Sequence, residues 1–450
     1  MLTSDFCSLF DRDSFVETLS YSSGDAPGDG GFSGTVTGYG TIGDRLIFAA
    51  FDSGSGADVQ PAHGINFGEK VVRTLKLAVS RKAPFMFVLK DSKVPALTSQ
   101  EILKPYYRII DALNDASGDI PLIFVSLGEC LGIFSLIAAR CDLHFIVGDS
   151  VRFGSLSPEA VSALTGTAPD TKPDKISFSP SISGIFGDLN KFRSYFAELL
   201  RYIPDNIFYG LYHEAGENID ALESGVFTDN ISMLKNIDLV RSLPDNGAFA
   251  ELFGYAGRGV LTGFSSFGGY PTGLICADGS GRDGLLDMDS LKKIRWFSIL
   301  CNNFGIPMVF LLDYKGLYAS GEDVHIMPAV IAGIAAELKC NNAVLKIVTG
   351  EAYGELNAVL LSGISNEPAS MAYAWENTYI DAINPASAAL MKYKSEIASS
   401  DDPIDTRLRY IDEYKKANSR SEFAAMRGII DDIIDPAETR NRIISFLKVL

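Results

Sequence analysis

Two short glycine-bounded segments of this chain combine residue types that could hold an anion on the backbone. Residues 128–132 read Gly-Glu-Cys-Leu-Gly, and residues 350–354, which follow 222 positions later (350 − 128), read Gly-Glu-Ala-Tyr-Gly. Each segment comes after a short apolar run and before a helical pattern. Glycine lets a ligand approach the main chain, and the first N–H groups of a helix have no partner within it. The pattern predicts two sites for a developing oxyanion, strengthened by the helix dipole.

A second pair of motifs keeps the same offset. Residues 91–93 (Asp-Ser-Lys) close the apolar run 85–89, and residues 313–315 (Asp-Tyr-Lys), again 222 positions later (313 − 91), close the run 308–312. Equal offsets favour a duplicated domain with a site between the two copies. For either segment alone, the glycines could equally serve close packing of strand and helix, and that alternative stays open.

Charged residues recur at the same places in both copies. Lys93 and Glu129 follow neighbouring predicted strands in the first copy, and Lys315 and Glu351 do so in the second. We hypothesise two equivalent Lys–Glu ion pairs that brace the strand ends. The alternative is four solvated surface charges, which is the usual state of such residues.

Side-chain chemistry of other kinds finds little support. The sequence has no phosphate-binding P-loop, no Gly-x-Ser-x-Gly elbow and no metal-ligand cluster. The histidines are too scattered to bind one metal ion: His63, His144, His213 and His325. This scarcity favours a reaction that relies on backbone amides and a cofactor.

The elements that must position these motifs alternate along each copy. A hairpin signal is followed by a helical pattern, at 69–80 and at 289–302, and then by short buried strands and further helices. This order predicts an α/β fold with parallel strands covered by helices. We expect an N-terminal domain at 1–235 and a C-terminal domain at 236–450, the latter ending in a charged helical tail.

Composition sets limits on class and partners. The 450 residues are 47% hydrophobic and 21% charged, as in globular proteins, and suffice for two domains. The net charge of −17 disfavours nucleic acid or an anionic membrane as the main partner. Six cysteines without a Cys-x-x-Cys pair indicate a reducing cytoplasm. We expect neither a signal peptide nor insertion into a membrane.

A resemblance to a known family extends over nearly the whole chain. Its most specific segment is the C-terminal run 424–436, Ala-Ala-Met-Arg-Gly-Ile-Ile-Asp-Asp-Ile-Ile-Asp-Pro, preceded by Glu413-Tyr414 and followed by Thr439-Arg440. Supporting matches are residues 14–17, 38–42, 68–70, 164–166 and 352–354. The chain resembles the carboxyltransferase (β) subunit of biotin-dependent acyl-CoA carboxylases, of the propionyl-CoA carboxylase β type.

The resemblance implies a fold, a reaction and an assembly. It implies two tandem crotonase-like (ββα superhelix) domains related by internal duplication, plus the helical tail. The implied activity moves a carboxyl group between carboxybiotin, borne on a separate biotin carboxyl carrier protein, and a short-chain acyl-CoA. The other implied partner is a biotin carboxylase subunit, and the implied assembly is a homo- or hetero-hexamer built as a trimer of dimers.

The resemblance also assigns site residues. The amides of Gly132 and Ile133 would hold the enolate oxygen of the acyl-CoA, and those of Gly354 and Glu355 the ureido oxygen of biotin. No metal is implied. The substrate-binding residues would be Asp91, Ser92, Cys130, Leu131, Tyr353, Asp313 and Gly316.

Four glycine motifs depart from the family pattern, which leaves alternatives open. Ile133 and Glu355 stand where the family has glycine, and residues 91–96 and 313–317 are also altered. A non-glycine residue keeps its N–H, although its side chain could fill the pocket. The alternatives are a catalytically silent paralogue within a hetero-oligomer and a subunit of a biotin-dependent acyl-CoA decarboxylase. A single-domain hydratase or isomerase is disfavoured.

Overall fold

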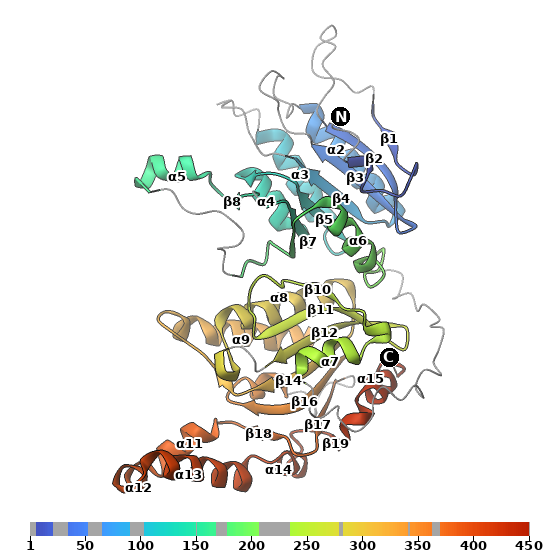
Figure 1. Ribbon diagram of the computed structural model, residues 1–450. Helices are drawn as coiled ribbons and strands as arrows, with labels where there is room; N and C mark the ends of the chain where they lie inside the picture. Colours follow the sequence, from blue (N-terminus) through green and yellow to red (C-terminus); the bar gives the residue numbers. More distant parts are fainter. Residues whose placement is uncertain are drawn as a thin grey trace. The chain divides into compact units, whose positions relative to one another are not determined.

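The structure is a computed structural model that divides into two compact units, Met1–Gly210 and Leu211–Leu450 (Figure 1). It describes residues 6–20, 35–52, 65–90, 103–149, 151–167, 178–206, 235–278, 282–340, 343–361 and 370–449. The predicted domain boundary after residue 235 stays a prediction, because residues 207–234 lie outside the described part.

The elements of the first unit follow the predicted alternation of strands and helices. They are β1 (Val16–Thr18), β2 (Thr35–Ile42), β3 (Arg45–Asp52), α2 (Ile65–Arg81), β4 (Phe85–Leu89), α3 (Leu103–Ala116), β5 (Leu122–Ser126), β6 (Cys130–Leu131), α4 (Ile133–Arg140), β7 (Leu143–Val147), β8 (Phe153–Gly154), α5 (Pro158–Thr165), β9 (Gly184–Phe186) and α6 (Leu189–Leu199).

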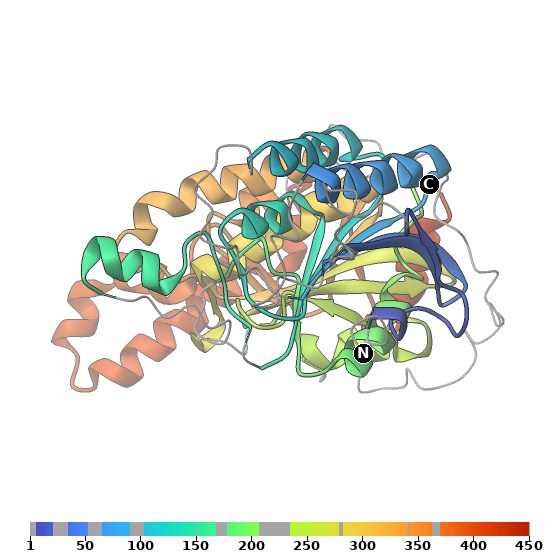
Figure 2. The same ribbon diagram turned by 90° about the horizontal axis from the view of Figure 1, so that it is seen from above.

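The sheet of the first unit has the order β1-β2-β3-β4-β5-β7-β9. The hairpin strands β1, β2 and β3 pair antiparallel, and every later pairing along this order is parallel. Helices α2 and α3 lie side by side and share one buried cluster with β3, β4 and β5 (Figures 1 and 2). Phe192 and Phe196 of α6 contact Phe145 of β7. Strands such as β4 and β5 are apolar throughout because both faces of the sheet are covered.

The second unit repeats this architecture and adds a helical end. Its elements are α7 (Asn236–Ser242), η5 (Asp245–Gly247), β10 (Ala250–Leu252), β11 (Val260–Phe267), β12 (Tyr270–Asp278), η6 (Arg282–Gly284), β13 (Leu285–Leu286), α8 (Met288–Phe304), β14 (Met308–Tyr314), β15 (Gly316–Leu317), α9 (Asp323–Cys340), β16 (Val344–Tyr353), α10 (Asn357–Leu360), β17 (Ser370–Trp375), β18 (Tyr379–Asp381), α11 (Pro385–Lys392), α12 (Lys394–Ser399), α13 (Pro403–Asn418), α14 (Ser421–Met426), β19 (Asp432–Ile434), η7 (Pro436–Glu438) and α15 (Thr439–Leu447).

The second sheet has the order β10-β11-β12-β14-β16-β17-β19, with β18 also paired to β16. Its hairpin is antiparallel and its later strands are parallel, as in the first unit. Helices α7 and α15 pack their apolar side chains on β12, β14 and β16 in one buried cluster. Small strand pairs, β6 with β8 and β13 with β15, accompany the two large sheets. The predicted α/β duplication is therefore visible in topology.

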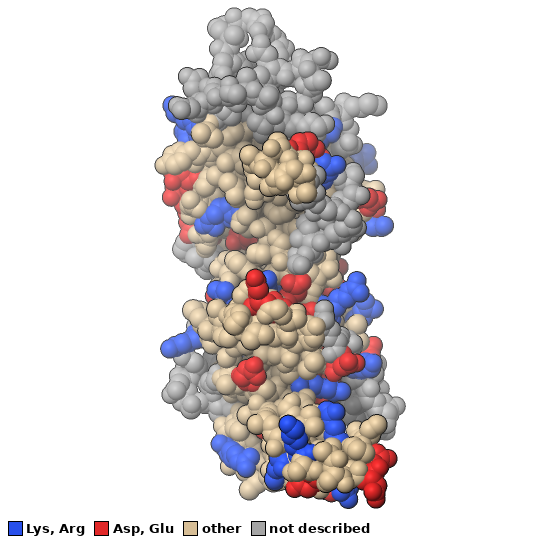
Figure 3. Space-filling view, turned by 90° about the vertical axis from the view of Figure 1, so that its left-hand side faces the viewer, with Lys and Arg blue, Asp and Glu red and all other residues tan. Residues whose placement is uncertain are grey.

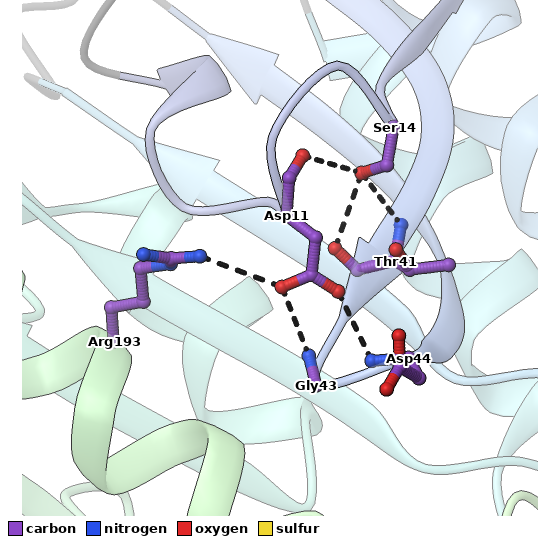
Figure 4. A network of polar contacts seen from close by, with 6 residues as sticks. All are labelled: Asp11, Ser14, Thr41, Gly43, Asp44 and Arg193. Atoms are coloured by element: carbon purple, nitrogen blue, oxygen red, sulfur yellow. Dashed lines mark hydrogen bonds and ion pairs between the residues drawn. The ribbon is translucent and has the colours of Figure 1, made fainter.

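An aspartate clasps the hairpin of the first unit. The Asp11 carboxylate accepts hydrogen bonds from the N–H groups of Gly43 (3.2 Å) and Asp44 (3.0 Å) in the turn between β2 and β3 (Figure 4). Arg193 of α6 binds the same carboxylate at 3.4 Å. The contact joins the start of the unit to its last described helix.

The second unit has an equivalent clasp. Asp245 accepts hydrogen bonds from the N–H groups of Gly268 (2.9 Å) and Gly269 (2.8 Å) in the turn between β11 and β12. Arg440 of α15 pairs with Asp245 at 2.6 Å and donates to the carbonyl of Leu243 at 2.7 Å. Each clasp fixes the hairpin from which the parallel strands begin.

Candidate functional site

In the first unit the predicted strand–turn–helix is present. Strand β5 ends at Ser126, residues 130–131 form β6, and α4 begins after Gly132. Gly132 has φ 60° and ψ −129°, a conformation that other residues avoid. A Cβ built on it would have no neighbour within 4 Å. The glycine is therefore required by its backbone angle, and the space beside it is open.

The backbone donors of this turn are partly occupied. The N–H of Gly132 donates to the carbonyl of Gly154 in β8 at 3.0 Å, and the N–H of Cys130 donates to the carbonyl of Arg152 at 2.8 Å. The N–H and the hydroxyl of Ser135 both donate hydrogen bonds to the Gly132 carbonyl. Within the described chain, the N–H of Ile133 has no backbone acceptor. One member of the predicted pair is thus available to a ligand, and the other holds β6 against β8.

The second unit differs at the corresponding point. The predicted turn at 350–353 is wrong, because these residues continue β16 as far as Tyr353. Gly350 is required by contact, since a Cβ there would lie 2.4 Å from the Asp313 carboxylate, which accepts the N–H of Glu351 at 2.9 Å. The helix that follows, α10, has only four residues. The predicted contribution of a helix dipole is therefore small in this unit.

The donors around Gly354 nevertheless repeat the pattern of the first unit. Gly354 has φ 100°, and its N–H donates to the carbonyl of Asp381 in β18 at 3.1 Å. The N–H of Glu355 has no backbone acceptor among the described residues. The nearest atom to a Cβ on Gly354 would be the Cα of Gly316, at 3.8 Å. In each unit, therefore, a positive-φ glycine donates its N–H to a neighbouring short strand, β8 or β18. Among the described residues, the N–H of the next residue has no backbone acceptor.

Large side chains beside these turns do not fill the space. Phe134 is fully buried in the core of the first unit, where it meets the rings of Phe67, Phe87 and Tyr106. Leu356 is also fully buried. Both side chains lie in the interior of their units, where packing absorbs their bulk.

Each unit has one glutamate beside a cation, Glu129 just before β6 and Glu351 within β16. Arg152 lies 3.5 Å from the carboxylate of Glu129 in the first unit. In the second unit, Lys415 lies 2.6 Å from Glu351, and Lys315 reaches the same carboxylate at 4.0 Å. The predicted Lys315–Glu351 pair is confirmed at the limit of an ion pair. The partner predicted for Glu129, Lys93, lies outside the described residues, as do Asp91 and Ser92.

Burial sets the protonation of several side chains at the second site. Burial, and then the nearby Glu351 and Asp278 carboxylates, raise the pKa of Asp313, against the effects of the Glu351 N–H and Lys315. Burial and the charge of Glu351 raise the pKa of the Tyr353 phenol. Its hydroxyl donates to Glu351 at 3.4 Å. Tyr353 therefore stays neutral and can only donate or accept hydrogen bonds.

Cys130 and Leu131 are buried in β6, and neither offers a nucleophile. Burial raises the pKa of the Cys130 thiol to about 12, so the thiolate is absent at neutral pH. Behind it, the Nε2 atom of His144 lies 2.8 Å from the Ser126 hydroxyl, and Nδ1 lies 2.5 Å from the carbonyl of Ser181. Sequence analysis gave no sign of this buried pair, since its members lie on different strands.

The first unit also has a cavity of about 500 Å³ at the carboxyl ends of its parallel strands. Ligands of parallel α/β sheets commonly bind at this edge. Its lining combines apolar side chains, glycines, one lysine and one aspartate: Ser8, Phe51, Lys90, Leu127, Val147, Gly148, Gly187, Asp188, Leu189 and Asn190. Leu127 directly precedes the Gly128–Gly132 segment, so cavity and turn adjoin.

The described residues offer neither a metal site nor a membrane-spanning helix. No group of three or more potential ligands could hold a metal ion there. No helix in the described part of the chain has the length and apolar character needed to cross a membrane.

Comparison with known proteins gives consistent matches. The model of the carboxyl transferase domain family matches residues 6–176 and 228–450. The carboxyltransferase subunit of propionyl-CoA carboxylase from Haloferax mediterranei is 24% identical over 94% of this chain and 83% of its own length. The alpha subunit of methylmalonyl-CoA decarboxylase from Veillonella parvula is 26% identical over 98% and 88%. A crystal structure of transcarboxylase 12S, a hexamer with hydrolysed methylmalonyl-CoA bound, superposes with a TM-score of 0.84 at 24% identity over 100% and 89%.

Proposed function

Since this chain belongs to the carboxyl transferase domain family, we propose that it moves a carboxyl group between biotin and a short-chain acyl-CoA. The resemblance noted in the sequence is thereby confirmed, and so is the tandem α/β fold shared with transcarboxylase 12S. The observation that best supports the proposal is the repeated turn. Among the described residues, each unit presents one amide without a backbone acceptor, at Ile133 and at Glu355, directly after a positive-φ glycine. A Cβ on Gly132 would have no neighbour within 4 Å, and one on Gly354 would have its nearest neighbour at 3.8 Å.

The residues present fit the two groups that the family implies. A thioester oxygen gains negative charge when the α-carbon is deprotonated, and a backbone N–H fixed in an apolar surrounding stabilises that charge. The Ile133 amide in the first unit has this character, with Phe134 and Cys130 buried around it. The Glu355 amide in the second unit would hold the ureido oxygen. When bound, biotin supplies the carboxyl group; the chain binds, orients and polarises.

The scarcity of catalytic side chains agrees with a reaction in which biotin supplies the carboxyl group and the chain supplies binding and backbone donors. Cys130 is held as a thiol and Tyr353 as a neutral phenol, so neither acts as a base at neutral pH. The cavity beside Leu127 offers space for part of the acyl-CoA at the strand ends. We further propose that biotin arrives on a separate carrier protein, that a biotin carboxylase subunit charges it, and that the working assembly is a cytoplasmic hexamer.

The amide at Ile133 can be removed with little harm to the fold. Ile133 is the first residue of α4, a position where proline is well tolerated because its N–H is not needed by the helix. Purified chain is assayed for propionyl-CoA formed from methylmalonyl-CoA and free biotin. We expect Ile133→Pro to lower kcat by about 100-fold or more, as for the loss of one oxyanion donor.

Ile133→Ala is the matched control, because it shortens the same side chain and keeps the N–H. It should retain activity within about threefold, because Ile133 is only partly buried against the core of the first unit. Equal losses in both variants, or full activity in Ile133→Pro, would contradict the proposed role of this amide. Circular dichroism of both variants verifies the fold.

A second candidate function has a specific observation in its favour. The amides of Gly132 and Gly354 already donate to carbonyls of β8 and β18, so each turn offers one donor where two were expected. This geometry suits a silent paralogue that supports an active carboxyltransferase subunit. Likeness to decarboxylase alpha subunits keeps the reverse direction, within a decarboxylase, equally open. Assays of the chain alone and with its co-purifying proteins separate these cases: turnover by the complex only, unaffected by Ile133→Pro, identifies the silent paralogue.

A further inference from the structure

Lys415 of α13 reaches from the helical end of the second unit into the candidate site. Helix α13 has no buried residue, yet the Lys415 side chain is only 26% exposed. Its Nζ atom lies 2.6 Å from Glu351 Oε1 and 3.9 Å above the centre of the Tyr379 ring. The ammonium group is therefore held by an ion pair with the carboxylate and by a cation–π contact with the ring.

Glu351 connects this lysine to the residues next to the free amide. Strand β18 pairs with β16 so that Glu351 lies opposite Tyr379 and Tyr353 opposite Asp381. The Tyr353 hydroxyl donates to the same Glu351 atom that Lys415 binds. Gly354 and Glu355 follow immediately. Lys415 and the Tyr353 hydroxyl thus meet at the Glu351 carboxylate, and the main chain of Tyr353 leads directly to the amide proposed to bind the ureido oxygen.

The surroundings of that amide are strongly acidic. Besides Glu351, the carboxylates of Asp313 and Asp381 lie on the neighbouring strand ends, and Glu355 is exposed. Lys315 is half exposed and at 4.0 Å offers Glu351 only weak compensation. An electron-rich oxygen approaching the Glu355 N–H would meet this negative charge unless a cation balances it.

We propose that Lys415 is a positioning residue of the second site, which neutralises Glu351 and holds its carboxylate away from the oxygen bound by Glu355 N–H. This inference rests on the proposed function and specifies it further. Lys415 does not touch the ligand. It acts through Glu351, so its effect should fall on binding of the biotin side of the reaction and leave the acyl-CoA side unchanged.

The first unit supports this assignment with a different construction. Arg152 balances Glu129, the residue equivalent to Glu351, at 3.5 Å. Arg152 directly precedes β8, whereas Tyr379, the first residue of β18, pairs with Glu351 and accepts Lys415 of the tail on its ring. Both copies therefore keep a cation at the glutamate although its source in the chain has changed. The recurrence of a cation beside the equivalent glutamate in both units favours a role for this ion pair.

The attachment of the tail does not depend on Lys415. The N–H of Ile380 donates to the carbonyl of Ser419, the N–H of Ser421 donates to the carbonyl of Thr378, and the Ser419 hydroxyl donates to Asp381. These bonds hold α13 and α14 against β18. Removal of one ammonium group therefore leaves the tail in place, and the lysine can be tested apart from the fold.

The next lysine provides a matched control. Lys416 forms an exposed ion pair with Asp412 on the same helix, away from Glu351. The helical end of the second unit carries charged side chains of both signs on its surface (Figure 3). Both lysines belong to α13. Lys415→Met and Lys416→Met thus each remove one positive charge from the same helix. Only Lys415→Met removes the ion-pair partner that lies 2.6 Å from Glu351.

The test measures the KM for free biotin and for methylmalonyl-CoA in the propionyl-CoA assay. We expect Lys415→Met to raise the KM for biotin on the order of tenfold, with the KM for methylmalonyl-CoA unchanged. Lys416→Met should match the wild type. Lys415→Arg should restore most of the affinity, and so should the double variant Glu351→Gln with Lys415→Met, because it removes the unbalanced charge.

Each outcome separates the inference from the proposed function. If the wild type transfers carboxyl groups and Lys415→Met leaves the KM for biotin unchanged, the inference is wrong while the function stands. If the double variant is as impaired as Lys415→Met, charge balance is not the role of Lys415. If the wild-type complex shows no transfer, the proposed function fails first and this inference with it.

Discussion

The two hairpin clasps have the same plan and different surroundings. In the first unit, Arg193 and Asp11 are 42% and 30% exposed and lie 3.4 Å apart. In the second, Arg440 and Asp245 are 15% and 21% exposed and lie 2.6 Å apart, with a further hydrogen bond from Arg440 to the Leu243 carbonyl. Two backbone N–H groups bind the aspartate in both. Both copies keep the hydrogen bonds between the aspartate and the turn, but they differ in the solvent exposure of the arginine.

Exposure decides what each clasp contributes to stability. A water-exposed ion pair contributes little, because solvent screens it and both side chains lose freedom. A partly buried pair is costly to break, because the surviving partner keeps its charge without compensation. The second unit should therefore depend on its clasp more than the first unit does.

The largest effect is expected from Arg440→Met. It leaves the Asp245 carboxylate and the Leu243 carbonyl without their cation, and should lower the free energy of unfolding of the second unit by about 3 kcal/mol. The only two tryptophans, Trp296 and Trp375, lie in this unit, and Trp375 donates to Thr439 at the start of α15. Urea unfolding followed by tryptophan fluorescence measures the change.

Arg442→Met is the control for this prediction. Arg442 forms a surface pair with Glu438 on the same helix, at 40% and 53% exposure, so its loss should cost less than about 0.5 kcal/mol. Similar losses in both variants would show that the clasp has no special role.

A smaller, pH-dependent effect distinguishes the cores of the two units. Burial lowers the pKa of His144 to about 4, from an ordinary value of about 6.5. As the pH falls through this interval, the unfolded chain binds a proton that the folded chain excludes, so the first unit loses stability, by about 2 kcal/mol near pH 4.5. His144→Gln should remove this part of the pH dependence.

The second unit lacks that response, because Ala372 occupies the place of His144 beside the strand equivalent to β5. Hydrogen exchange followed by mass spectrometry reports each unit separately. Protection in β5 and β7 should fall with pH in the wild type more than in the variant, and β16 should be equal in both. A β5 response that persists in His144→Gln would assign the acid sensitivity to other groups.

The smallest effect is expected from Arg193→Met. The pair with Asp11 is exposed, and the turn keeps its two N–H bonds to the carboxylate, so the first unit should lose about 0.5 kcal/mol. Hydrogen exchange in β2 and β3 measures it. A loss as large as that of Arg440→Met would overturn the comparison, since exposure would then not control the strength of the clasp.

Sequence alone predicted the elements whose signal is local. The apolar run 85–89 became β4 without change, and the helical patterns at 69–80 and 289–302 fall within α2 and α8. Equal offsets between the copies matched Glu129 with Glu351, although Glu129 follows the end of β5 and Glu351 lies within β16. The equal offsets indicated the duplication, and the family resemblance added which α/β fold is duplicated.

Contacts between distant segments escaped prediction for a physical reason. Lys415 and Arg152 reach the glutamates from positions 64 and 23 residues further along the chain (415 − 351 and 152 − 129), and no local pattern links them to those glutamates. The continuation of β16 through Glu351 depends on its pairing with β18, which no local propensity reveals. The carbonyls that accept the amides of Gly132 and Gly354 likewise belong to strands about 22 and 27 residues further along the chain. Which backbone N–H groups remained without an acceptor therefore depended on how the strands pair, and not on where each strand or helix begins and ends.

The tie between each positive-φ glycine and its outer strand has a consequence for engineering. Because β8 and β18 hold the backbone at Gly132 and Gly354, the direction of the next N–H is set by main-chain atoms alone. Residues 129, 133, 351 and 355 can then be randomised together in a library without rebuilding the loop beneath them. Variation at residues 129 and 133 would change the acyl side of the proposed site and variation at 351 and 355 the biotin side, around two stationary donors.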